Sequence, residues 1–108
     1  MSRRFLLTPQ AAEDLREILL DLADVSPSAA ERLRLLFAKI FEALAKSPGS
    51  GHYHEELLDR RFRFRNLFSY VVCYAWESKP IRIVAVVHGS RELTAFFGSR
   101  GPETPRQP

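Results

Sequence analysis

The amino-acid sequence predicts an α+β fold of two layers, in which a helix hairpin packs on a small, mainly antiparallel sheet. Two helical stripes of apolar residues occupy the first half of the chain, and three strand-like runs follow in the second half. One further strand precedes the helices, which gives the order β-α-α-β-β-β. Helices and strands that follow one another in separate runs segregate into a helical layer and a sheet layer. A short helix at about residues 91–97 is expected to follow the last strand.

Both helices are predicted to begin at a hydroxyl residue followed by proline. Residues 3–8 form the expected first strand, and Thr8-Pro9 then supplies an N-cap and a proline for the first helical position. Ser26-Pro27 repeats this chemistry for a second helix, which ends at Ser47-Pro48. We expect a joint of three or four residues and an antiparallel hairpin. The apolar stripes are Ala11, Ala12, Leu15, Ile18, Leu19 and Leu22 in the first helix, and Leu33, Leu36, Phe37, Ile40, Phe41 and Leu44 in the second.

Three strands are predicted at residues 58–65, 68–76 and 81–88, with a turn at Asn66-Leu67 between the first two. In the first of them the phenylalanines alternate with arginines, so that one face is apolar and the other basic. We expect Phe62 and Phe64 to point at the helices, which leaves Arg61, Arg63 and Arg65 exposed on the open face. In the second, Phe68, Tyr70, Val72, Tyr74 and Trp76 share one face.

The run from 81 to 88 is apolar at nearly every position, which is typical of a strand buried on both faces. It ends in His88, and Arg91 follows after Gly89-Ser90. An imidazole and a guanidinium at the end of a rigid strand are suited to holding anions. A simpler interpretation of His88 is that it caps the sheet through a backbone carbonyl or Glu92.

Composition and charge narrow the class of protein. The 108 residues carry a net charge of +3, but residues 1–50 balance, whereas residues 60–91 hold seven Lys or Arg against one Glu. This asymmetry favours a polyanion or an acidic partner, or else marks a solvated basic face. The single Cys73 excludes an intramolecular disulfide, and no apolar run approaches the ~20 residues of a membrane span. We expect a cytoplasmic protein with no membrane association, one domain over residues 1–98 and a flexible tail over 99–108, which contains three prolines.

In order and spacing, these features resemble the RelE/ParE superfamily of toxins from bacterial type II toxin–antitoxin systems. The resemblance extends from Phe5 to about Phe97 and rests on four segments. They are Leu7-Thr-Pro-Gln-Ala-Ala-Glu-Asp-Leu15, Leu44-Ala-Lys-Ser-Pro-Gly49, the Arg-Phe-Arg strand running into Tyr70-Val-Val-Cys-Tyr74, and Ile83-Val-Ala-Val-Val-His-Gly-Ser-Arg-Glu92. The resemblance implies growth inhibition, a role in plasmid stabilisation, and a hetero-oligomer with a cognate antitoxin.

The superfamily divides by target. RelE-like members are ribosome-dependent mRNA endonucleases, and ParE-like members inhibit DNA gyrase. Cleavage through the RNA 2′-hydroxyl needs a base, an acid and positive charge on the phosphorane. A nuclease of this sequence would use His88, Arg63, Arg65 and Arg91, because Tyr70 and Tyr74 fall on an apolar face.

RelE-like nucleases generally place a tyrosine soon after the last strand, and here none follows Tyr74. The ending His-Gly-Ser-Arg-Glu is instead similar to the ParE branch. We therefore predict a gyrase inhibitor that acts by binding, with no catalytic residues. The alternatives are an mRNA endonuclease that acts on the ribosome, and a degenerate toxin that retains only antitoxin binding.

The binding residues follow from charge, exposure and position. The predicted target contacts are Arg61, Arg63, Arg65, His88, Arg91, Phe96 and Phe97. The predicted antitoxin contacts are Leu20, Leu35 and Phe97, the two leucines because they fall outside the apolar stripes. No metal or other cofactor is expected, since His52 and His54 beside Glu55 and Glu56 are typical of an ordinary polar loop.

Overall fold

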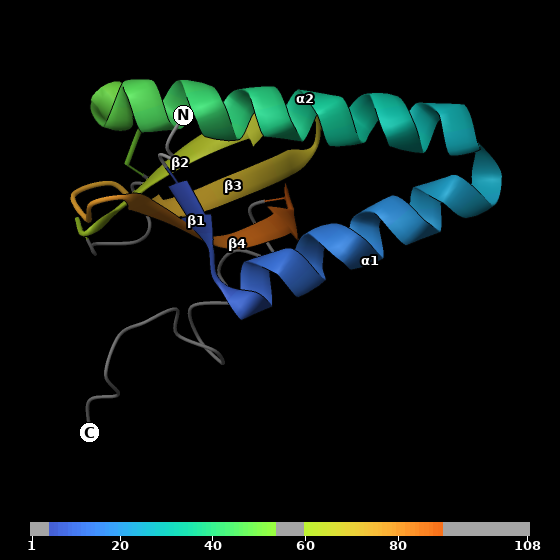
Figure 1. Cartoon of the computed structure of the whole chain (residues 1–108), viewed down its shortest axis with the longest axis horizontal. Coiled ribbons are helices and arrows are strands. Elements are labelled where there is room, and N and C mark those ends of the chain that lie inside the picture. The colour runs from blue at the N-terminus through green and yellow to red at the C-terminus, as the bar shows by residue number, and fades with distance from the viewer. Residues whose placement is uncertain (1–4, 54–59, 90–108) are drawn as a thin grey trace.

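The computed structural model describes residues 5–53 and 60–89 of the chain. Its four strands form one sheet in the order β1-β4-β3-β2, with β1 parallel to β4 and the other pairs antiparallel. The elements are β1 (Phe5–Leu7), α1 (Pro9–Val25), α2 (Pro27–Lys46), the 3-10 helix η1 (Pro48–Ser50), β2 (Phe62–Leu67), β3 (Tyr70–Ala75) and β4 (Ile81–His88). The predicted α+β class, the element order and the mainly antiparallel sheet are confirmed (Figure 1).

The helix hairpin is joined by one residue, Ser26, and not by the three or four that the sequence predicted. The backbone N–H of Ser26 donates to Leu22 O at 2.8 Å and closes α1, while its hydroxyl accepts from Ala29 N at 3.2 Å and opens α2. Pro27 occupies the first position of α2, where no N–H is needed. Thr8 caps α1 in the same way, accepting from Ala11 N at 3.1 Å. Figure 1 shows the two helices meeting at the right of the view, away from the sheet.

The main core lies between the hairpin and one face of the sheet. The α2 helix contributes its predicted apolar stripe, in which every residue except Leu36 is buried. The sheet contributes Val72, Tyr74, Ile81, Ile83 and Val86. In α1 only Ala11 is buried, and the rest of its predicted stripe except Ala12 packs half-buried against this core. Phe37 meets the ring of Tyr70 edge-on, with 5.9 Å between the centroids. The helices therefore fix the positions of strands β3 and β4.

A second apolar cluster lies on the opposite face of the sheet, and it corrects one sequence prediction. Phe62 and Phe64 belong to this cluster and not to the core beneath the helices. The register explains why: Phe64 pairs with Cys73, whereas Arg63 pairs with Tyr74, whose ring faces the helices. Facing residues of paired strands point to the same side. The arginines of β2 therefore share the helix side of the sheet, and the predicted assignment of the two faces was wrong.

The turn between β2 and β3 also differs from the prediction. Asn66 and Leu67 continue β2, and the turn consists of Phe68 and Ser69, closed by the pair Leu67–Tyr70. Phe68 is 74% exposed and lies outside the apolar face on which the sequence placed it. The last strand matches its prediction from Ile81 to His88 and is buried on both faces. A β-bulge lies within it, because Cys73 pairs with Ala85 while Tyr74 pairs with Ile83.

Neither long helix of the described residues combines the length and apolarity that crossing a membrane requires. Within residues 5–53 and 60–89, no three His, Cys, Asp or Glu side chains gather as metal ligands would. The predicted helix at 91–97 and tail at 99–108 lie outside these residues, as do His54, Glu55 and Glu56 of the predicted polar loop.

Candidate functional site

The end of β4 and the β2–β3 turn together form a rim of the sheet, made of Phe68, Ser69, Tyr70 and His88. We call these four residues the hairpin rim. His88 lies opposite Tyr70 in the ladder, and their rings stack with centroids 4.9 Å apart and planes inclined by 27°. Nε2 of His88 lies 2.9 Å from the Ser69 hydroxyl. The exposed imidazole is thus held in a fixed orientation by the Tyr70 ring and the Ser69 hydroxyl. The sequence had suggested a backbone carbonyl or Glu92 as its partner.

Phe68 is the residue of this rim that sequence reasoning missed. Its φ is +55°, a conformation that glycine and asparagine adopt easily and that a bulky side chain rarely does. A large aromatic ring that is 74% exposed on such a backbone contributes little to the core. Backbone strain combined with an exposed ring is found preferentially at binding surfaces. The sequence offered no turn signal here, because Phe-Ser is an unusual pair for a two-residue hairpin turn.

Arg63 is engaged within the protein. Its guanidinium donates to Gly51 O at 2.8 Å and to the hydroxyl of Tyr53 at 3.4 Å. The same group lies 4.4 Å from the ring centroid of Tyr53 and 4.2 Å from that of Trp76. The guanidinium of Arg60 also covers Tyr53, at 4.1 Å. Arg63 therefore ties the segment after η1 to the sheet, and it is half-buried where the sequence predicted an exposed target contact.

Tyr74 also ties η1 and the residue after it to the sheet. Its hydroxyl donates to Pro48 O at 2.6 Å and accepts from Gly51 N at 2.9 Å. Burial raises the pKa of Tyr74, and the hydrogen bond from Gly51 and the charge of Arg63 oppose this rise. The ring is fully buried, as the sequence predicted for a core tyrosine with a tethered hydroxyl.

The remaining basic residues are distributed along β2. Arg65 pairs with Val72, is half-buried, and forms no hydrogen bond or ion pair with any residue that the structure describes. Arg61 precedes the strand, is exposed, and lies 5.5 Å above the ring of Phe62. Arg91, Phe96 and Phe97 lie outside the described residues.

The register separates Arg63 from His88, two of the residues that the sequence predicted for a nuclease. Arg63 lies opposite Tyr74 and His88 lies opposite Tyr70, so the two are about 13 Å apart along the strands and on opposite sides of β3. Arg65 is nearer, two positions along β3 from Tyr70. All three share the helix side of the sheet, but Arg63 and His88 are too far apart to contact one phosphate.

Replacing Arg63 and Arg65 separately should give different losses of stability. We expect Arg63→Ala to lower the free energy of unfolding by about 1–3 kcal/mol, because it removes two hydrogen bonds and two ring contacts. Arg65→Ala, the matched control on the same face, should change it by no more than about 0.5 kcal/mol. Urea denaturation of the two variants measures the difference, and equal losses would contradict the role given to Arg63.

The predicted antitoxin contacts on the helices are exposed. Leu20 of α1 is 52% exposed and Leu35 of α2 is 50% exposed. Leu35 lines a shallow groove of α2 together with Leu36 and Lys39. Their role in antitoxin binding stays a prediction.

The chain thus combines a strand, a helix hairpin and a three-stranded meander, with arginines along β2 and an imidazole at the end of β4. The family model described as the ParE toxin of type II toxin-antitoxin system, parDE, matches residues 5–93. The chain belongs to this family, and its resemblance to type II toxins is confirmed. A comparison with curated proteins found no match.

Proposed function

We propose that this protein inhibits DNA gyrase by binding it, and that a cognate antitoxin neutralises it in a hetero-oligomeric complex in the cytoplasm. Membership of the ParE toxin family supports the proposal. The observation that carries it is the engagement of Arg63 with Gly51 and Tyr53, which leaves it far from His88. Because Arg63 is held at this distance by its own contacts, it cannot supply positive charge beside His88, and this favours binding over catalysis.

The hairpin rim and the neighbouring basic side chains form the proposed gyrase contact. Phe68 supplies an exposed ring, His88 an oriented imidazole, and Arg65 a cation without a partner among the described residues. Aromatic and arginine side chains carry most of the binding energy in protein interfaces. Arg61 lies at the other end of β2, and Arg91, Phe96 and Phe97 are retained as contacts from the sequence alone. Leu20, Leu35 and Phe97 are the proposed antitoxin contacts.

Two assays on the purified full chain, freed of antitoxin, test the proposal. In a supercoiling reaction we expect loss of gyrase activity and accumulation of cleaved DNA. On ribosomes programmed with mRNA we expect the message to stay intact. Cleavage of the message with normal supercoiling would overturn the proposal in favour of the endonuclease, and inactivity in both assays would favour the degenerate toxin.

The endonuclease remains the second candidate because of one observation. His88 stacks on Tyr70, which brings an imidazole and a phenol together at the edge of the sheet. An imidazole and a phenol can serve as base and acid in RNA cleavage. If the message is cut, Tyr70→Phe should lower the cleavage rate while leaving ribosome binding unchanged.

Replacing Phe68 separates function from stability. Phe68→Gly should weaken gyrase inhibition by about 10- to 30-fold, because an exposed aromatic anchor is lost. The free energy of unfolding should change by no more than about 1 kcal/mol, because glycine relieves the strain of the positive φ but loses more conformational entropy on folding. Inhibition titrations and thermal unfolding measure the two effects.

Val25→Ala is the matched control for this change. Val25 is 82% exposed at the end of α1, away from the rim, so its replacement should leave inhibition unchanged. Equal inhibition by the Phe68 variant and the parent chain would remove the hairpin rim from the proposed contact.

A further inference from the structure

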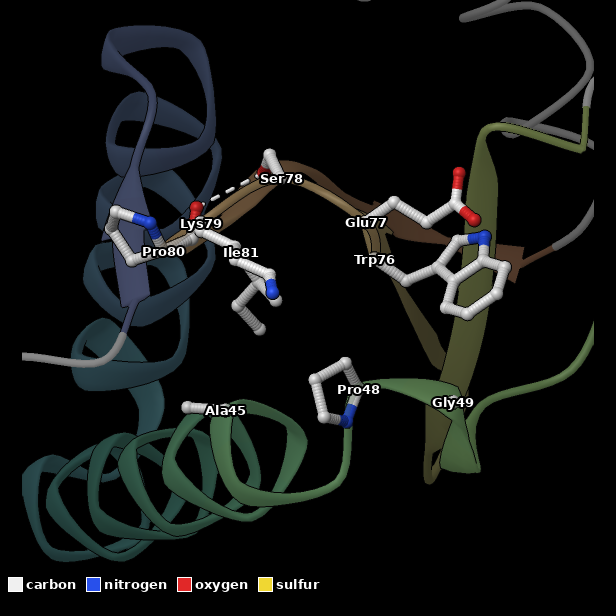
Figure 2. A pocket seen from close by; sticks show the side chains of 9 residues that line it. All are labelled: Ala45, Pro48, Gly49, Trp76, Glu77, Ser78, Lys79, Pro80 and Ile81. Carbon is white, nitrogen blue, oxygen red and sulfur yellow. Dashed lines mark hydrogen bonds between the residues drawn. The ribbon is translucent and has the colours of Figure 1, made fainter.

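An apolar pocket of about 830 Å³ lies at the other end of β4, away from the hairpin rim. It opens between the C-terminal end of α2, the 3-10 helix η1 and the β3–β4 turn. Figure 2 shows Trp76 on the right of the opening, Pro80 and Ile81 on the left, and Pro48 and Ala45 below. Flat rings and aliphatic groups thus form most of its wall.

The walls of this pocket are held in place by contacts behind them. The indole N–H of Trp76 donates to Arg60 O at 3.1 Å, and the Arg63 guanidinium covers one side of the ring. The Ser78 hydroxyl lies 3.1 Å from Ala75 O and 3.0 Å from Pro80 O, which braces the turn. A pocket fixed in this way is ready to accept a ligand without reorganisation.

The edge of the pocket carries two side chains of opposite charge, Glu77 and Lys79. Both side chains are exposed, and neither forms an ion pair with any residue within the described ranges. A ligand for this pocket would therefore present apolar rings on one edge and both an acidic and a basic group beside them.

The chain itself contains a segment with this pattern. Its C-terminal stretch from Gly101 reads Gly-Pro-Glu-Thr-Pro-Arg-Gln-Pro and lies outside the described residues. Proline recurs there every third residue, and polyproline II has three residues per turn. In that conformation the prolines form one edge, while Glu103 and Arg106 form the next, about 9 Å apart. Gly101, Thr104 and Gln107 form the third edge.

We infer that residues 102–108 dock in the Trp76 pocket of the same chain as a polyproline II segment. The proline edge packs on Trp76, Pro48 and Pro80, as proline-rich peptides pack on aromatic grooves elsewhere. Glu103 faces Lys79 and Arg106 faces Glu77, so that each charge at the pocket meets its opposite. This inference goes beyond the flexible tail predicted from the sequence, and it is independent of the proposed target.

The length of chain available permits this docking. The pocket lies beside Ile81 at the start of β4, about 25 Å from the other end of this strand. The 13 residues from 90 to 102 span up to about 43 Å when extended. The tail can therefore return along the sheet and still place its prolines in the pocket.

Trp76 is the only tryptophan of the chain, so its fluorescence in the full-length protein reports on the pocket directly. Replacing Pro102 and Pro105 together by Ala should shift the emission of Trp76 to longer wavelength and increase its quenching by acrylamide. Replacing Thr104 and Gln107 together by Ala, the matched control on the third edge, should change neither quantity. Circular dichroism verifies that both variants keep the parent fold.

Charge reversal at Lys79 provides a second, independent test of the docking. Lys79→Glu should lower the ratio of docked to free tail by about two- to five-fold, and adding Glu103→Lys should restore it. An emission spectrum of the proline variant identical to that of the parent chain would overturn the inference. A parent spectrum that depends on protein concentration would overturn it as well, because the tail of a second copy would then be the occupant.

Discussion

Phe64→Ala is expected to lower the free energy of unfolding by about 3–5 kcal/mol, which is among the largest effects of a single truncation. Phe64 is 1% exposed and belongs to the apolar cluster on the face away from the helices. Its ring lies 6.4 Å from that of His52, and the two residues also exchange backbone hydrogen bonds of 2.9 and 2.7 Å. Chemical denaturation of the purified variant measures the loss.

Phe68→Ala is the matched control, because it makes the same substitution in the same hairpin at a residue that is 74% exposed. It should change the free energy of unfolding by no more than about 0.5 kcal/mol. Losses of similar size at the two positions would contradict the second core, since Phe64 would then be no better packed than an exposed ring.

Gly51→Ala should be nearly as damaging, at about 2–4 kcal/mol. A Cβ atom at this position would lie 2.5 Å from the Tyr74 hydroxyl and 2.8 Å from the carbonyl oxygen of Phe64. The second neighbour is backbone inside a strand and cannot move aside. Relief of the contact would break the hydrogen bonds that join Tyr74 to Gly51 and Pro48.

Gly49→Ala, two residues earlier, provides the comparison. The nearest atom to a Cβ there is Cζ3 of Trp76 at 4.0 Å, an ordinary van der Waals distance. We expect no significant change in the midpoint of thermal unfolding for this variant. A lower midpoint for Gly49→Ala than for Gly51→Ala would show that the hydrogen-bonded closure around Tyr74 does not matter for stability.

Local chemistry in the sequence was enough to predict the elements and their order. Thr8-Pro9 and Ser26-Pro27 marked both helix starts because the hydroxyl and the fixed φ of proline act within one turn. The apolar run at 81–88 marked the central strand for a similar reason. The one-residue joint at Ser26 was missed, because a helix end and a helix start at the same residue leave no separate signal.

The sequence alone could not predict which face of β2 points at the helices. Alternation shows that Phe62 and Phe64 share a face, but both faces of this sheet carry apolar residues, so either orientation buries them. The pairing of Arg63 with Tyr74 decides which face of β2 points at the helices, and the turn sets this pairing. That turn contains Phe68 at positive φ, which no propensity rule favours.

The candidate site was predicted in part. His88 lies at the end of its strand as expected, but its stacking on Tyr70 and its bond to Ser69 depend on the register. Arg63 was predicted as a target contact because its alternation with Phe62 and Phe64 placed it on an exposed basic face. Its contacts with Tyr53 and Trp76 arise from segments 10 and 13 residues away in the chain, and sequence patterns do not report such proximity.

The pairing of β1 with β4 has a consequence for the order of synthesis. Phe5–Leu7 adds to the sheet beside Ile81–Ile83, and Asp14 in α1 accepts a hydrogen bond from Val86 N at 3.1 Å. A ribosome therefore releases the N-terminal strand and both helices long before their partner strand exists. Chains that join distant segments in this way fold slowly and late. During translation, the sheet of a growing copy therefore stays incomplete until the strand that ends at His88 has emerged.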